Sequence, residues 1–145
     1  MQHLLFAAAQ LGVRVHVAHL DDPEVLGCYD HARAAIFLSM DLTPFEMRSV
    51  LAHELGHAYF GDSCSTGANE RRAERYAATL LITPDAYAMA EAIDPHPEAI
   101  AEELQVTADI VRTYQEQCLQ RLGRTTYGRS TRTGLSSAVA RRLSI

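Results

Sequence analysis

Hydrophobic and polar residues alternate along residues 13–20, where valines at every second position would share one face of an extended chain. This period of two is typical of a half-buried β-strand. Two further apolar segments, residues 25–30 and 34–40, are separated by three residues, the right length for a hairpin connection. The pattern predicts an α+β fold whose small, twisted, antiparallel sheet has about three strands.

Apolar residues with helical spacing occupy most of the remaining chain. One helix begins at Thr43, which can cap it, followed by Pro44 and by Glu46 in the capping-box position. That helix ends at Gly61. Inside it, Gly56 is unfavourable for helix formation and indicates that another backbone packs closely there. Further helices are predicted over residues 2–11, 69–82, 84–94, 98–104 and 108–122.

The capped helix contains the motif H-E-x-x-H, formed by His53, Glu54 and His57. The two histidines are four residues apart, so both imidazoles lie on one helix face and can bind one metal ion. Glu54 lies beside them, where it can take a proton from a water molecule and later give it to a leaving amine. The motif therefore predicts a hydrolytic metal site, the alternative being a surface helix that carries two histidines by chance.

A catalytic zinc ion takes three protein ligands, so the two histidines need a third. The metzincin pattern requires Gly and His where this chain has Phe60 and Ser63, which excludes that class. The next predicted helix offers Glu70 and Glu74 on one face. As in thermolysin-like zincins, we expect Glu70 to bind the metal and Glu74 to orient His53. The alternative is a solvated charged face, since the segment reads ERRAER.

These segments resemble the ImmA/IrrE family of metallopeptidases, in which the H-E-x-x-H helix is followed by E-x-x-A-x-x-[FY]-A-x-x-L-L and a proline. The matching residues are Glu70, Ala73, Tyr76, Ala77, Leu80, Leu81 and Pro84. Glu74 departs from the pattern, which usually has Asn or Asp there. The resemblance implies a compact zincin-like domain encoded in bacteria, often on prophages or mobile elements. It also implies that the protein substrate is a helix-turn-helix transcriptional repressor, cleaved at one site to release silenced genes.

Two histidines and one carboxylate favour a single Zn²⁺ ion as the cofactor. Two other functions remain open. The segment 95–122 has the spacing of a helix-turn-helix, as in a DNA-binding regulator. Its second helix, however, offers only Arg112 as a cation in the first turns, beside Asp109 and Glu116, so direct nucleic-acid binding is not expected. The other alternative is a zinc-containing anti-repressor that binds its partner without cutting it.

Charge is unevenly distributed along the 145-residue chain, whose net charge is −5. All 18 acidic residues precede residue 117, whereas the segment from there onward carries six arginines and no acid. The acidic body argues against nonspecific binding of nucleic acids, while the basic segment leaves a local contact with an anion open. We expect residues 1–94 to form the metallopeptidase core, residues 95–122 to pack on it, and residues 123–145 to form a partly disordered basic tail.

The three cysteines are widely spaced and form no C-x-x-C pair. This argues against a disulfide framework and suggests a reducing, cytoplasmic location. No apolar segment is long enough to cross a bilayer, so no membrane partner is expected. The apolar N-terminal stretch is preceded by no positive residue, and we interpret it as the first helix rather than as a signal peptide.

Overall fold

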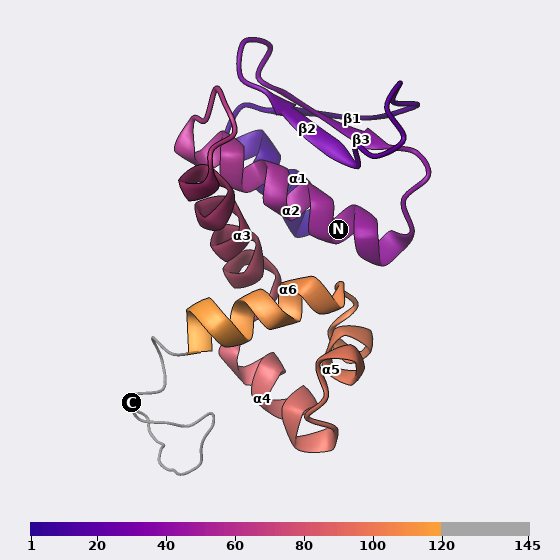
Figure 1. Ribbon diagram of the computed structural model, residues 1–145, viewed down its shortest axis with the longest axis vertical. Coiled ribbons are helices and arrows are strands. Elements are labelled where there is room, and N and C mark those ends of the chain that lie inside the picture. The colour runs from indigo at the N-terminus through magenta and orange to yellow at the C-terminus, as the bar shows by residue number, and fades with distance from the viewer. Residues whose placement is uncertain (120–145) are drawn as a thin grey trace.

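The computed structural model describes residues 1–119 (Figure 1). Over this range the chain forms several helices and one small sheet, so the α+β prediction is confirmed. The elements in chain order are α1 Gln2–Gln10, β1 Arg14–Ala18, β2 Gly27–Asp30, β3 Ala35–Ser39, α2 Pro44–Phe60, α3 Gly67–Leu81, α4 Pro84–Ile93, α5 Pro97–Leu104, α6 Ala108–Thr113 and the π-helical turn η1 Tyr114–Cys118. None of the described helices is long and apolar enough to cross a membrane.

The sheet is mixed, and the prediction of a purely antiparallel sheet is wrong. Its strand order is β1-β3-β2, with β2 antiparallel to β3 as the hairpin predicts, but with β1 parallel to β3. The physical reason lies in β3, which is buried along nearly its whole length and therefore needs a neighbour on each side. The connection after β1 carries the chain past the position of β3, so that β2 pairs with the other side of β3. The alternation of apolar and polar residues within a strand does not encode this arrangement.

One hydrophobic cluster holds the described elements together. Leu38 of β3 and Leu55 of α2 belong to it, as do Ala77 of α3 and Val106 and Val111 of the α5–α6 region. In Figure 1, α2 lies along the sheet, and α3 leads from α2 toward the group formed by α4, α5 and α6. The predicted boundary at residues 94 and 95 therefore lies within a continuous core.

Local chemistry explains both ends of α2. The Thr43 side chain accepts a hydrogen bond from the Glu46 backbone N–H at 3.3 Å, and Pro44 occupies the first turn, as predicted. Gly61 ends the helix in the left-handed conformation, with φ at 69°. At Gly56, a Cβ atom would lie 2.8 Å from the Cα of Ala73, so this glycine permits the close packing of α2 on α3. The predicted close approach is confirmed.

The α5–α6 pair is joined by a tight turn that is bound to α2. Gln105 adopts the left-handed conformation at the end of α5. The Arg48 guanidinium donates hydrogen bonds to the backbone carbonyls of Leu104 and Gln105. The Ser49 hydroxyl accepts one from the Thr107 backbone N–H at 3.2 Å. These contacts fix the start of α6 against the helix that carries the H-E-x-x-H motif. The predictions for residues 120–145, including the basic tail, lie outside the described residues.

Candidate metal centre and active site

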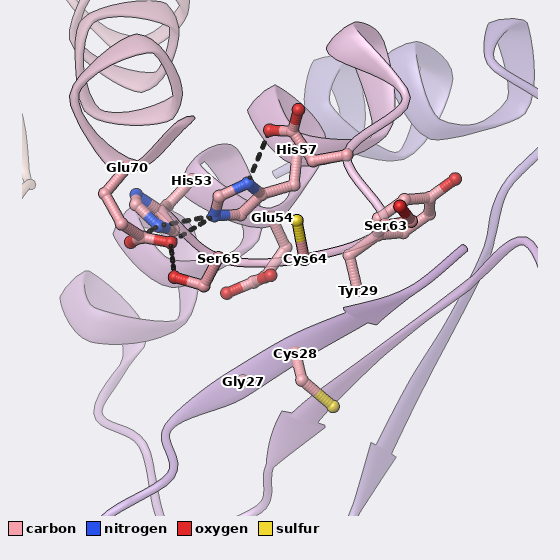
Figure 2. Close-up of a pocket in the computed structure, with 11 residues that line it drawn as sticks. Gly27, Cys28, Tyr29, His53, Glu54, His57, Ser63, Cys64, Ser65 and Glu70 are labelled. Carbon is pink, nitrogen blue, oxygen red and sulfur yellow. Dashed lines mark hydrogen bonds and ion pairs between the residues drawn. The ribbon is translucent and has the colours of Figure 1, made fainter. Parts of the chain in front are cut away.

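A cleft of about 410 Å³ opens between the edge of the sheet and the two longest helices (Figure 2). Strand β2 forms one wall, α2 supplies the motif residues, and the loop between α2 and α3 covers one end. The lining residues are Gly27, Cys28, Tyr29, His53, Glu54, His57, Asp62, Ser63, Cys64, Ser65 and Glu70. All four residues that the sequence predicts as metal ligands or general base therefore line one cleft.

The three predicted ligands point toward one another in this cleft (Figure 2). The Nε2 atoms of His53 and His57 lie 3.2 Å apart. The Glu70 carboxylate completes the triangle, with Oε1 at 3.2 Å from His53 Nε2 and Oε2 at 3.1 Å from His57 Nε2. Residues from two different helices are thus brought together as one group of three donor atoms.

The geometry and chemistry of this group fit a zinc ion. Four ligands that lie about 2.0–2.1 Å from a tetrahedral zinc are about 3.3 Å from one another. The two imidazole nitrogens are 3.2 Å apart, and with one carboxylate oxygen of Glu70 they form a group whose donor atoms all lie within 4.8 Å of one another. Two imidazole nitrogens and a carboxylate oxygen are also a common ligand set for catalytic zinc. Burial and the nearby charge of His57 lower the pKa of His53, which favours the neutral ring that a metal requires.

The Glu70 carboxylate is held in place by the loop that precedes α3. Ser65 Oγ donates a hydrogen bond to Glu70 Oε2 at 2.7 Å. Thr66 caps α3 by accepting from the Asn69 backbone N–H, and this sets the register that turns Glu70 toward the histidines. Burial alone would raise the pKa of Glu70, but the Ser65 hydrogen bond and the two histidines outweigh it, so the pKa is lowered. Glu70 therefore favours the ionised state of a ligand.

Glu54 lies deeper in the cleft, and only 8% of its surface is exposed. Burial is the main cause that raises its pKa to about 7, while the charge of His57 and a backbone hydrogen bond from Tyr29 act in the opposite direction. A carboxylate with a pKa near neutrality can both accept and return a proton. The neighbouring strand β2 thus contributes to the orientation of the predicted general base.

With this geometry established, comparison with known proteins identifies the family. A family profile described as the IrrE N-terminal-like domain (Peptidase_M78) matches residues 8–113, which is more than half of the chain. The chain belongs to this IrrE-like family. It is a metallopeptidase of the IrrE/ImmA type, and the family resemblance drawn from the sequence is confirmed. No curated protein matches the chain.

The IrrE-like site contains one interaction that sequence reasoning missed. The Oδ2 atom of Asp62 lies 2.9 Å from Nδ1 of His57, and the Asp62 side chain is only 6% exposed. On the other side, Arg72 donates to Asp62 Oδ1 at 2.8 Å and lies over the Phe60 ring. Gly61 places Asp62 there, because its left-handed turn folds the chain back and lets the Asp62 N–H bond to the His57 carbonyl. The sequence pair Gly61-Asp62 is the signal that could have indicated this role.

The predicted orienting role of Glu74 stays a prediction. Glu74 lies one turn beyond Glu70 on α3, and its charge acts to raise the pKa of His53. Within residues 1–119, no hydrogen bond joins Glu74 to His53, whose Nε2 contacts His57 and Glu70. Glu74 instead lines a groove that adjoins the active-site cleft. In this IrrE-like site, Asp62 is the carboxylate that contacts Nδ1 of a predicted ligand, His57.

Proposed function

We propose that this metallopeptidase is a zinc-dependent endopeptidase that cuts a protein substrate at an internal bond. The observation that carries the proposal is the triangle of donors from His53, His57 and Glu70, with the buried Glu54 carboxylate in the same cleft. A ligand triangle without a nearby base would suit a structural metal. The presence of a carboxylate with a pKa near neutrality favours hydrolysis instead.

The ligands and their supports have separate tasks in this proposal. His53, His57 and Glu70 would hold the ion, and Asp62 would keep the His57 ring oriented. Bound zinc would polarise the carbonyl of the scissile peptide bond and lower the pKa of a water molecule. A closed structural zinc site uses four protein ligands, whereas the group found among residues 1–119 has three donors and lines a cleft that is open to solvent.

Glu54 would move the proton that peptide hydrolysis requires. Its ionised form accepts a proton from the attacking water, and its protonated form then gives that proton to the leaving amine. A pKa of about 7 places both forms within reach at neutral pH. The hydrogen bond from the Tyr29 backbone holds the carboxylate at the wall of the cleft that faces the sheet.

Strand β2 would align an extended substrate. It is an edge strand of the described sheet, and Gly27 and Tyr29 line the cleft. Leu26 and Ser39 share a ladder hydrogen bond, so the alternation of an antiparallel pair directs the backbone groups of Gly27 and Tyr29 away from β3. The Tyr29 N–H bonds to Glu54, which leaves the Gly27 groups and the Tyr29 carbonyl for a substrate. Polypeptides commonly bind to such an edge through backbone pairing. A Cβ at residue 27 would lie 2.6 Å from Val50 Cγ1, so glycine keeps this edge close to α2.

The substrate that we propose is a helix-turn-helix transcriptional repressor, on the basis of the family resemblance. The packing of the α5–α6 pair supports a protein substrate over DNA. Ile110 and Val111 on α6 are buried in the core, and the start of α6 is bound to α2. The side of α6 that remains accessible carries Asp109, and Glu116 follows it in η1. These acids would repel the phosphates of a nucleic acid.

The test is incubation of the zinc-loaded full chain with the repressor encoded beside it. We expect one discrete cut, seen as two fragments by intact-mass spectrometry. Glu54→Gln should abolish the cut while the protein keeps its metal, because only the proton carrier is lost. Glu102→Gln, on the exposed face of α5, is the matched control and should cleave normally. Repressor that binds the wild-type protein but stays intact would favour the anti-repressor that acts without proteolysis.

A further inference from the structure

A second groove, of about 840 Å³, continues from the active-site cleft. The two share Gly27, His53 and Glu54, so a chain that passes through the cleft can extend directly into the groove. The groove runs between the segment before β2 on one side and α6 with η1 on the other, and α2 and α3 form its floor. A substrate segment next to the scissile bond would lie here.

The walls of this groove combine apolar side chains with an excess of carboxylates. Val25 and Leu26 line one side, and Ile110 lines the other. Leu26 is 47% exposed and Val25 is 37% exposed, so both present apolar surface that a ligand can cover. The carboxylates that line the groove are Glu24, Glu46, Glu54, Glu74, Asp109 and Glu116. An apolar surface under carboxylates matches side chains with a long aliphatic stem and a cationic end.

Few cations from the described part of the chain neutralise these carboxylates. Among residues 1–119, Arg112 is the one Lys or Arg residue that lines the groove, and it is already paired with Glu98 and Asp109. Within residues 1–119, no ion pair includes Glu24, Glu46, Glu74 or Glu116. A cleft of one charge sign with low-dielectric walls concentrates its electrostatic field and attracts the opposite charge.

We propose that this groove selects substrates with Lys or Arg close to the scissile bond. The inference rests on the proposed peptidase function and names the sequence class that the same site accepts. The cationic ends would pair with Glu24, Glu74 and Glu116, while the aliphatic stems lie on Val25 and Leu26. Arginine would suit the groove particularly well, because its planar guanidinium forms two parallel hydrogen bonds with a carboxylate.

Binding tests the groove without depending on cleavage. Zinc-loaded Glu54→Gln full chain is titrated into a short fluorescein-labelled peptide of alternating Arg and Ser, and into its counterpart with Gln for each Arg. We expect the Arg peptide to bind about tenfold more tightly at low salt, because the small binding free energies of several exposed ion pairs add up. Equal affinity for the two peptides would overturn the proposal.

A pair of charge-matched variants separates the groove from the overall acidity of the protein. Glu24→Gln with Glu116→Gln removes two charges from opposite walls of the groove, whereas Glu102→Gln with Glu103→Gln removes two from the exposed end of α5. Both are made in the Glu54→Gln background. Only the groove pair should lose the preference for the Arg peptide. An equal loss in both pairs would overturn the proposal, because the attraction would then come from net charge.

Cleavage distinguishes a failure of this inference from a failure of the proposed function. Wild-type full chain is incubated with a complex peptide mixture prepared with an acid-specific protease, and new termini are identified by mass spectrometry. Enrichment of Lys and Arg beside the cut is expected. Cuts without that enrichment would overturn the groove assignment and leave the peptidase intact. If no cuts appear in this mixture or in the repressor, but the groove-dependent preference in binding remains, the peptidase function fails instead.

Discussion

The Nδ1 atom of His57 lies 2.9 Å from the buried Oδ2 atom of Asp62. Because a carboxylate oxygen only accepts, Nδ1 is the donor in this contact, which leaves Nε2, facing His53 and Glu70, as the nitrogen that can bind a metal. A carboxylate that holds a ligating imidazole in this way fixes the ring and raises its basicity. Arg72 in turn holds Asp62 at 2.8 Å. The left-handed turn at Gly61, which ends α2, therefore places the carboxylate that orients the predicted ligand His57.

This relationship predicts that Asp62→Asn weakens zinc binding without removing a ligand. Asparagine keeps the shape of the side chain but loses the charge that supports the ring, so affinity should fall about 10- to 100-fold. Competition with a zinc-binding chromophore measures the affinity. Asp85→Asn, at the exposed start of α4, is the matched control and should not change it. Unchanged affinity in Asp62→Asn would show that the His57–Asp62 contact has no role in metal binding.

Gly56→Ala is predicted to destabilise the fold although alanine favours helices. The helix preference contributes about 1 kcal/mol in favour of alanine. The added Cβ, however, would lie 2.8 Å from the Cα and 3.0 Å from the carbonyl oxygen of Ala73, and two packed backbones separate only at a larger cost. We expect the free energy of unfolding in urea to fall by about 1 kcal/mol or more.

Gly67→Ala is the matched control for that measurement. Its added Cβ would meet only the mobile end of Arg71, at 3.4 Å. The change in unfolding free energy should stay within about 0.5 kcal/mol. Equal stability of Gly56→Ala and wild type would mean that α2 and α3 can move apart more easily than their close packing indicates.

The buried Glu54 carboxyl predicts a pH dependence in the metal-free protein. Its pKa is raised from 4.5 to about 7 in the folded state, so the folded state holds a proton that the unfolded chain has already lost. The resulting stability is fully present below pH 4.5 and disappears as the pH rises through about 7. Wild type should therefore lose stability relative to Glu54→Gln across this range. Urea unfolding in the presence of a chelator measures the difference, and a difference independent of pH would contradict the assignment.

The sequence predicts the elements whose cause is local. Thr43 and Pro44 start α2 because a cap and a proline act within one turn, and the spacing of His53 and His57 follows from helix geometry alone. The prediction of Glu70 as the third ligand depends on its place in the helix that follows the H-E-x-x-H helix and on the family resemblance. The structure places it within 3.2 Å of the histidines.

The remaining features depend on tertiary packing. The parallel pairing of Arg14 with Ala35 joins segments that are distant in sequence, and the alternation within a strand is the same for either strand direction. Asp62 was overlooked because its role requires the left-handed turn at Gly61 and the approach of Arg72 from another helix. The acidic groove is likewise assembled from four separate parts of the chain.

The central claim is that His53, His57 and Glu70 bind one catalytic zinc ion, and elemental analysis of the purified full chain tests it most directly. We predict about one zinc per chain in wild type and in Glu54→Gln, and its loss in His57→Ala and Glu70→Gln. His31→Ala, an exposed histidine outside the triangle, should retain the metal. Folded wild-type protein without zinc after preparation in excess zinc, or full occupancy in His57→Ala, would contradict the account.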